Sequence, residues 1–163
     1  MKKLVLMLIA MAMLLTGCAW PHLGMYAPQS GATELGDLTL VLWASHRSLN
    51  VNQPITIRFT AKNDGKQTVV YDRKDKPVID IYIPGGIPSV RWSDGKLPTP
   101  DITRLELKPG ESKAIEMTWK PGEEYNHQVV SIDGFVWWCA EDRPCFNRVG
   151  LTITVGFTFS PLP

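Results

Sequence analysis

Cysteines are the residues best able to do covalent chemistry in this 163-residue chain, which contains three of them. Cys139 and Cys145 are separated by five residues. On a straight strand this spacing would place them about 20 Å apart, far beyond the roughly 6 Å between the Cα atoms of a disulfide. We therefore predict that residues 140–144 fold back as a loop, closed by a disulfide between Cys139 and Cys145. An extracytoplasmic location would favour this oxidation.

The third cysteine, Cys18, follows an N-terminal segment with the pattern of an export signal. Lys2 and Lys3 precede an apolar run that is shorter than the about 20 residues of a bilayer-spanning helix. Residues 15–18, Leu-Thr-Gly-Cys, resemble the bacterial lipobox, in which cleavage before the cysteine leaves its sulfur acylated. We predict a lipoprotein signal peptide over residues 1–17 and a lipidated Cys18. The alternative is an ordinary signal peptide in which Cys18 is incidental.

A lipid on Cys18 would hold the chain on the membrane of a bacterial cell envelope. Ala19, and not an Asp, follows the cysteine, which resembles lipoproteins sorted to the outer membrane. In a Gram-negative host the chain would then face the periplasm. The following residues are rich in Pro, Gly, Ser and Ala and show no hydrophobic period. We predict that residues 18–36 form the lipidated cysteine and a flexible tether.

Other residue patterns give little support for catalysis or metal binding. His46 and His127 stand apart, and the chain has no Gly-x-Ser-x-Gly, phosphate-binding or His-Glu-x-x-His motif. A metal site at Cys139 and Cys145 would need two further ligands, and their spacing is not the Cys-x-x-Cys of redox enzymes. An enzyme is therefore the least supported class, and we expect no cofactor and no metal.

The charge balance bears on the class of partner. The chain has 17 Lys and Arg against 16 Asp and Glu, a formal charge of +1. Loss of the signal segment with Lys2 and Lys3 leaves a slight acidic excess. Because near-neutral charge of mixed sign gives no electrostatic basis for nucleic-acid binding, we expect no nucleic-acid partner.

Hydrophobic periodicity indicates the elements that must position these residues. From residue 37 onward apolar residues recur with a period of two, as at Ile55, Ile57 and Phe59. This alternation is typical of strands with one face on a core and the other in water. About eight or nine short strands with frequent turns predict an all-β chain, folded as one antiparallel immunoglobulin-like β-sandwich over residues 37–163.

The most distinctive local pattern covers residues 89–119. Asp94-Gly95 predicts a hairpin turn, because glycine tolerates the positive φ that such turns require. A strand is expected over residues 103–107, then a reversal at Pro109-Gly110, then a strand that ends at Trp119. These elements together predict an antiparallel meander. Asp133-Gly134 predicts a further bulge or bend.

The same stretch resembles the intracellular proteinase inhibitor (BsuPI) domain family, although Val90 stands where the family pattern has a first Trp. The resemblance extends upstream to a turn at residues 63–66 and covers roughly residues 37–138. It implies a domain that binds and inhibits a peptidase, and its motif supplies no reactive-site residue. The matching residues are Arg91, Trp92, Ser93, Asp94, Gly95, Leu107, Pro109, Gly110, Glu111, Ser112, Thr118 and Trp119.

An inhibitor must present an ordered loop whose preorganisation lowers the entropic cost of binding. Two loops qualify by composition, the Pro- and Gly-rich residues 84–88 and the predicted ring that contains Arg143. One of the two adjacent tryptophans at residues 137–138 should also point outward. The alternative is a non-inhibitory immunoglobulin-like module that binds proteins or has a structural role in the cell envelope. The candidate partner-binding residues are Pro84, Gly85, Gly86, Ile87, Pro88, Trp138 and Arg143.

Overall fold

A computed structural model describes residues 27–85, 89–138 and 146–156. The predictions for residues 1–17, Cys18, Gly86, Ile87, Pro88, Cys139, Arg143 and Cys145 lie outside these ranges and stay predictions. The described chain forms eleven strands, one short α-helix and one 3-10 helix. These elements are β1 (Gln29–Leu35), β2 (Leu38–Ala44), β3 (Ser48–Leu49), β4 (Ile55–Asn63), β5 (Val69–Asp72), β6 (Ile79–Ile83), β7 (Val90–Arg91), α2 (Pro100–Thr103), β8 (Arg104–Leu107), β9 (Ser112–Trp119), η1 (Glu123–Tyr125), β10 (Gln128–Trp137) and β11 (Phe146–Val155).

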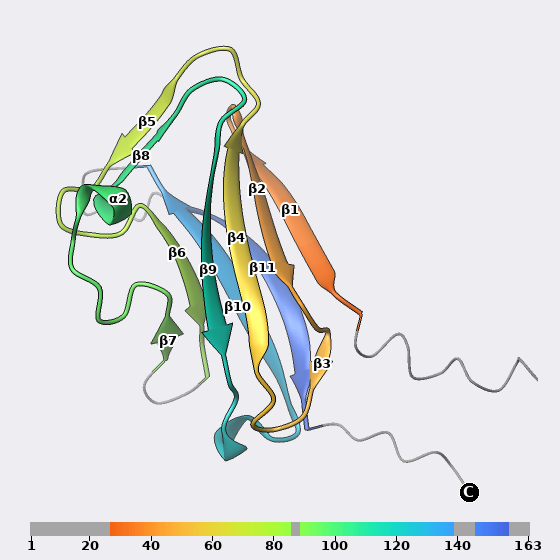
Figure 1. The fold of residues 1–163 in the computed structure, drawn as a ribbon. Coiled ribbons are helices and arrows are strands. Elements are labelled where there is room, and N and C mark those ends of the chain that lie inside the picture. Colours follow the sequence, from red (N-terminus) through yellow and green to blue (C-terminus); the bar gives the residue numbers. More distant parts are fainter. Residues whose placement is uncertain (1–26, 86–88, 139–145, 157–163) are drawn as a thin grey trace, which may run out of the picture.

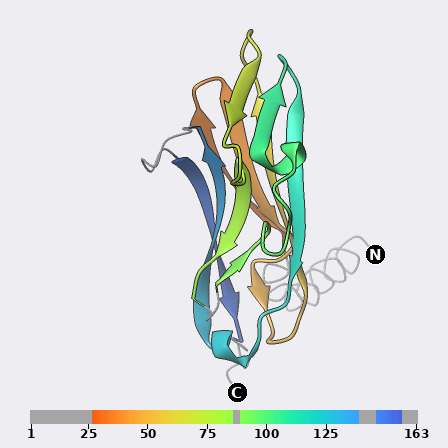
Figure 2. The ribbon, with the colours of Figure 1, turned by 90° about the vertical axis from the view of Figure 1, so that its left-hand side faces the viewer.

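The strands form two main sheets that lie face to face (Figures 1 and 2). One sheet has the order β1-β2-β4-β9, and the other has the order β3-β11-β10-β6-β7. A small third sheet pairs β5 with β8. All pairings are antiparallel except the short one between β3 and β11. The prediction of an all-β, antiparallel, immunoglobulin-like sandwich is therefore confirmed, with more strands than expected because two of them, β3 and β7, have only two residues each.

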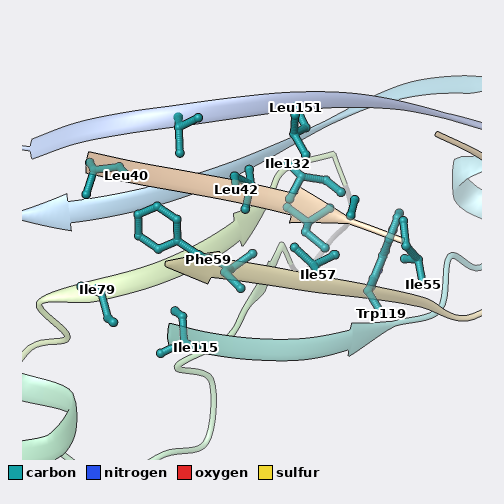
Figure 3. Close-up of a cluster of buried hydrophobic side chains, with 14 of the residues drawn as sticks. Leu40, Leu42, Ile55, Ile57, Phe59, Ile79, Ile115, Trp119, Ile132 and Leu151 are labelled. Carbon is teal, nitrogen blue, oxygen red and sulfur yellow. The ribbon is translucent and has the colours of Figure 1, made fainter. Parts of the chain in front are cut away.

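Alternating apolar residues of both sheets fill the space between them (Figure 3). Along β4 the buried positions Ile55, Ile57 and Phe59 alternate with residues that face outward, as the sequence predicts. β6 and β10 contribute buried residues such as Ile79 and Ile132 from the opposite sheet. Burial of such side chains contributes on the order of 1.5–3 kcal/mol each, so this core is the main source of the stability of the fold.

The predicted tether is too long, because residues 29–35 form β1. This strand pairs with β2 along its whole length and lies against β11. A Cβ atom at Gly31 would lie only 3.1 Å from the backbone oxygen of Gly150. The close approach explains the glycine at residue 31, and the strand as a whole lacks the apolar period by which strands are recognised in a sequence.

The predicted meander over residues 89–119 is also wrong in its pairing. β8 pairs with β5, and β9 pairs with β4, so that the two strands flanking Pro109-Gly110 belong to different sheets. Asp94-Gly95 turns the chain after β7, which pairs back with β6. The bend expected at Asp133-Gly134 is absent, because both residues continue β10 and pair with β11. Local turn residues identify reversals but do not choose the partner strand.

The sandwich has two ends, which we call the near end and the far end. β1 begins and β11 ends at the near end, which is the lower end in Figure 1. β10 ends and β11 begins at the far end. The side chain of Gln29 bonds to the backbone of Thr152 and that of Asn147 to the backbone of Glu34, which aligns the two sheets from one end to the other.

None of the described helices is long and apolar enough to cross a membrane.

Candidate functional site

The family motif at residues 91–95 is organised around Asp80, a residue of β6 whose side chain is fully buried. The backbone N–H of Ser93 donates to Asp80 Oδ1 at 3.1 Å, and the Ser93 hydroxyl donates to Oδ2 at 2.8 Å. The N–H of Ile81 donates to Oδ1 at 2.9 Å. Arg91 Nη1 lies 3.4 Å from Oδ2. A buried carboxylate needs such donors, because an unpaired charge away from water is costly.

Burial of Asp80 also changes its proton affinity. The loss of water around the carboxylate raises the pKa of Asp80 above its ordinary value of 3.8, while the hydrogen bonds from Ser93 and the charge of Arg91 act in the opposite direction. The low-dielectric surroundings thus outweigh the donors in setting this pKa.

The remaining residues of this motif close the turn on itself. Arg91 N–H donates to Asp94 Oδ2 at 2.7 Å, and Gly95 has a φ of +74°, which glycine adopts readily. Trp92 is half-buried against the core, and Lys96 Nζ lies 4.1 Å from its ring centroid. The motif therefore builds a rigid turn on β6 and β7.

The second part of the motif, at Pro109-Gly110-Glu111, docks on Asn63 at the end of β4. Gly110 N–H donates to the Asn63 carbonyl at 2.8 Å, and Asn63 N–H donates to the Glu111 carbonyl at 2.9 Å. The buried Asn63 amide donates to the carbonyl of Leu107 at 2.9 Å and to that of Gln67 at 2.7 Å. Asn63 therefore links the turn between β4 and β5 to the turn between β8 and β9.

The last motif residue, Trp119, lies inside the sandwich. Its ring meets the ring of Tyr125 edge-on, with centroids 4.9 Å apart. Trp119 pairs with Ile55 at the near end, whereas the Asn63 turn lies at the far end. The motif residues are thus not brought together into one surface site, and each described contact is structural. Sequence reasoning missed Asp80; the only signal was a carboxylate in an otherwise apolar strand.

The candidate partner-binding residues within the described ranges lie at opposite ends of the sandwich. β6 runs antiparallel to β10, so Pro84 and Gly85 follow β6 at the near end. Trp138 follows β10 at the far end and is 39% exposed. Ten residues of β10 separate these ends, about 30 Å. Pro84 and Trp138 therefore do not belong to one compact surface.

Aromatic side chains gather on the outer face of β10 and β11 at the far end. Trp137 and Phe146 have ring centroids 4.8 Å apart, and Phe135 lies 6.0 Å from Trp137 and 5.4 Å from Phe146. The guanidinium of Arg73 lies 4.6 Å from the Trp137 ring centroid. Sequence reasoning identified the tryptophan pair but could not place Phe146 beside it, because that contact depends on strand register.

A shallow pocket of about 180 Å³ also lies at the far end, lined by Glu34, Asp37 and Asp64 among others. It is smaller than the usual pocket for a small molecule, which is roughly 300–1,000 Å³. The side chain of Lys62 bonds to Asp64 and lowers the pKa of that carboxyl. Within the described ranges no group of three or more His, Cys, Asp or Glu side chains is placed to hold a metal ion.

The fold and the motif contacts define an immunoglobulin-like β-sandwich whose characteristic turns are fixed by buried polar groups. The sequence pattern of the family described as intracellular proteinase inhibitor (BsuPI) matches residues 43–132. This match covers more than half of the chain, and the chain belongs to that family. No curated protein matches the sequence.

The solved structures to which the chain is similar have low sequence identity to it. The CARDB domain from Pyrococcus furiosus, solved in solution, is 18% identical; the match covers 76% of this chain and 97% of that domain, with a TM-score of 0.43. Its crystal structure with di-metal ions is 14% identical, covering 80% and 94%, with a TM-score of 0.39. A β-glucosidase from Erythrobacter marinus is 13% identical with a TM-score of 0.39; the match covers 79% of this chain but only 15% of the enzyme.

Proposed function

We propose that this chain is a lipid-anchored, extracytoplasmic proteinase inhibitor that binds a peptidase through its folded domain. The family match over residues 43–132 carries the inhibitor part of the proposal, and a peptidase is the class of partner that the family description names. The anchored location rests on the signal pattern of residues 1–17 and on Cys18. The rigid sandwich suits this role, because a preorganised surface binds with a smaller loss of conformational entropy.

A second candidate function is favoured by one specific observation. The motif residues Arg91, Ser93 and Asp94 make contacts that hold a turn together, and none of these contacts requires a peptidase. The family scaffold could therefore be kept in a non-inhibitory module that binds another protein of the cell envelope. Fold and scaffold residues alone do not fix the function.

An inhibition titration separates these two functions. The chain from residue 18 onward, with Cys18→Ser to prevent lipidation and the other two cysteines oxidised, is titrated against subtilisin-like and trypsin-like peptidases. The inhibitor proposal predicts a stoichiometric loss of activity of at least one peptidase while the chain stays intact on a gel. Full activity at micromolar excess of the folded chain would reject inhibition of these classes and leave the binding module.

A further inference from the structure

One surface on the outer face of the larger sheet has no structural role in the family motif. It consists of Phe135, Trp137 and Phe146 with Arg73 and Arg148, and is named the far-end patch. We propose that the far-end patch is the surface through which the anchored chain contacts its peptidase, at a site where that peptidase presents a carboxylate beside apolar side chains. This inference rests on the proposed function and adds the contact surface and its chemistry.

The aromatic part of the patch is preassembled. Phe135 lies almost fully buried beneath, Trp137 stacks near it with an interplanar angle of 23°, and Phe146 packs edge-on with 37% of its surface exposed. Because these rings fix one another, little side-chain entropy remains to be lost when a partner covers them. Aromatic residues are enriched at the centres of protein interfaces.

Two guanidinium groups flank the aromatic part and define the partner's chemistry. Arg73 stacks on Trp137 and donates through Nη1 to the carbonyl of Pro77 at 3.0 Å, which fixes the side chain in place. Arg148 pairs with Phe135 across the sheet; its side chain is 64% exposed, and its Nη1 lies 3.9 Å from Asp133 Oδ2. Guanidinium groups bind carboxylates through paired N–H donors, and Arg148 has donors directed to solvent for this purpose.

The end of the sandwich at which the anchored N-terminal segment enters β1 determines which end a partner can reach. A lipid on Cys18 would be joined to the start of β1 at Gln29 by ten residues, with a flexible span of about 17 Å. The near end would therefore lie close to the membrane. Gln29 bonds to Thr152, which is opposite Ser131, so the far-end patch lies roughly 13–20 Å further along β10, on the side open to the aqueous compartment. This placement favours a soluble protein over lipid as the occupant of the patch.

The test compares a variant at each end of the same sheet in the inhibition titration. Phe146→Ala with Arg148→Ala removes exposed groups of the patch, and Val129→Ala is the matched control, because Val129 is 62% exposed at the near end of β10. We expect the double variant to weaken inhibition about tenfold or more, as for interface anchor residues, and the control to change it less than about twofold. Thermal unfolding confirms that both variants are folded.

A second measurement tests the orientation without a peptidase. Hydrogen exchange of the lipidated chain is compared on vesicles of phosphatidylethanolamine and phosphatidylglycerol and in the lipid-free form. We expect protection by vesicles to be confined to near-end segments such as residues 123–129. Protection of residues 146–149 would overturn the inference.

The outcomes separate this inference from the function on which it rests. Unchanged inhibition by the double variant, with loss of inhibition in Pro84→Gly, would overturn the far-end patch and leave the inhibitor function standing. Absence of inhibition by the unsubstituted chain would overturn the inhibitor function, and with it the partner named for the patch.

Discussion

Ser93 donates two hydrogen bonds to Asp80, a residue thirteen positions earlier in the chain, one from its backbone N–H and one from its hydroxyl. Asp80 lies on β6, and Ser93 lies in the turn that follows β7, the edge strand of the larger sheet. This pair explains why a Ser stands inside the Arg-Trp-Ser-Asp-Gly motif. The motif is a structural device that fixes the turn after β7.

Removal of the Ser93 hydroxyl tests this explanation. Ser93→Ala leaves the buried carboxylate with one donor fewer, so the free energy of unfolding should fall by about 1.5–3 kcal/mol, the range for hydrogen bonds to charged groups. Ser112→Ala is the control, because Ser112 is exposed at the start of β9 and should change stability by less than about 0.5 kcal/mol. Urea unfolding measures both values. Equal effects of the two substitutions would contradict the explanation.

The raised pKa of Asp80 predicts an unusual pH dependence. The folded state binds this proton more tightly than the unfolded state, so the contribution of Asp80 to stability is fully present below about 3.8 and is lost as the pH rises through its folded pKa. As the pH falls from neutral, protonation of Asp80 should therefore raise the free energy of unfolding. Asp80→Asn should remove this pH-dependent rise. Urea unfolding across this pH range compares the slopes of the two proteins.

Asp64 is a control, because its pKa shift should make stability depend on pH in the opposite direction. Its pKa is lowered, chiefly by the side chain of Lys62, so its contribution is present above 3.8 and is lost as the pH falls through the folded pKa. Asp64→Asn should change the pH slope in the opposite direction from Asp80→Asn. The same direction for both would show that the burial of Asp80 does not control its proton affinity.

Asn63 should be among the polar residues most important for folding. Asn63→Ala removes the amide that bonds to Leu107 and Gln67 and the oxygen that accepts from Gly65 N–H. Because buried partners are left unpaired, we expect a loss of about 2–4 kcal/mol. Asn147→Ala, which removes an exposed amide-to-carbonyl bond, should cost less than about 1 kcal/mol. A similar loss for both would contradict the assigned role.

Gly134 shows why the sequence predicted a bend where the structure has a strand. A Cβ atom at Gly134 would lie 2.4 Å from Cδ2 of Phe59, which is fully buried. The glycine therefore makes room for a core ring from the opposite sheet. Gly134→Ala should destabilise the fold by about 1–3 kcal/mol through overpacking. In the double variant with Phe59→Leu, chemical denaturation should show that part of this loss is recovered; full additivity would contradict the packing explanation.

The sequence predicts the fold wherever one face of a strand is buried. The alternation along β4 and β2 identifies both strands and their buried faces, because every second residue contacts the core. It fails at β1, where Gly31 is selected for close approach to β11 and not for apolar burial. It also fails for the partners of β8 and β9, because pairing depends on contacts between residues far apart in the chain.

The candidate site was predicted less completely than the fold. The turn after β7 is held through Asp80, which lies outside the motif on β6 and accepts from Ser93, and the local sequence pattern does not indicate this contact. Trp138 is exposed because it follows the end of β10, whereas Trp137 lies on the outer face of that strand beside Phe146. The cluster of Trp137 with Phe146 requires the register of β10 with β11, which the alternation of residues leaves open.

The most direct test of the anchored inhibitor uses the lipidated chain on vesicles. The vesicles are mixed with a peptidase selected by the inhibition titration, sedimented, and assayed for peptidase activity in the supernatant and the pellet. The proposal predicts that the peptidase sediments with the vesicles and loses activity in proportion to the bound chain, while vesicles without the chain leave it active in solution. Full activity in the supernatant, with the folded chain shown to be on the vesicles, would contradict it.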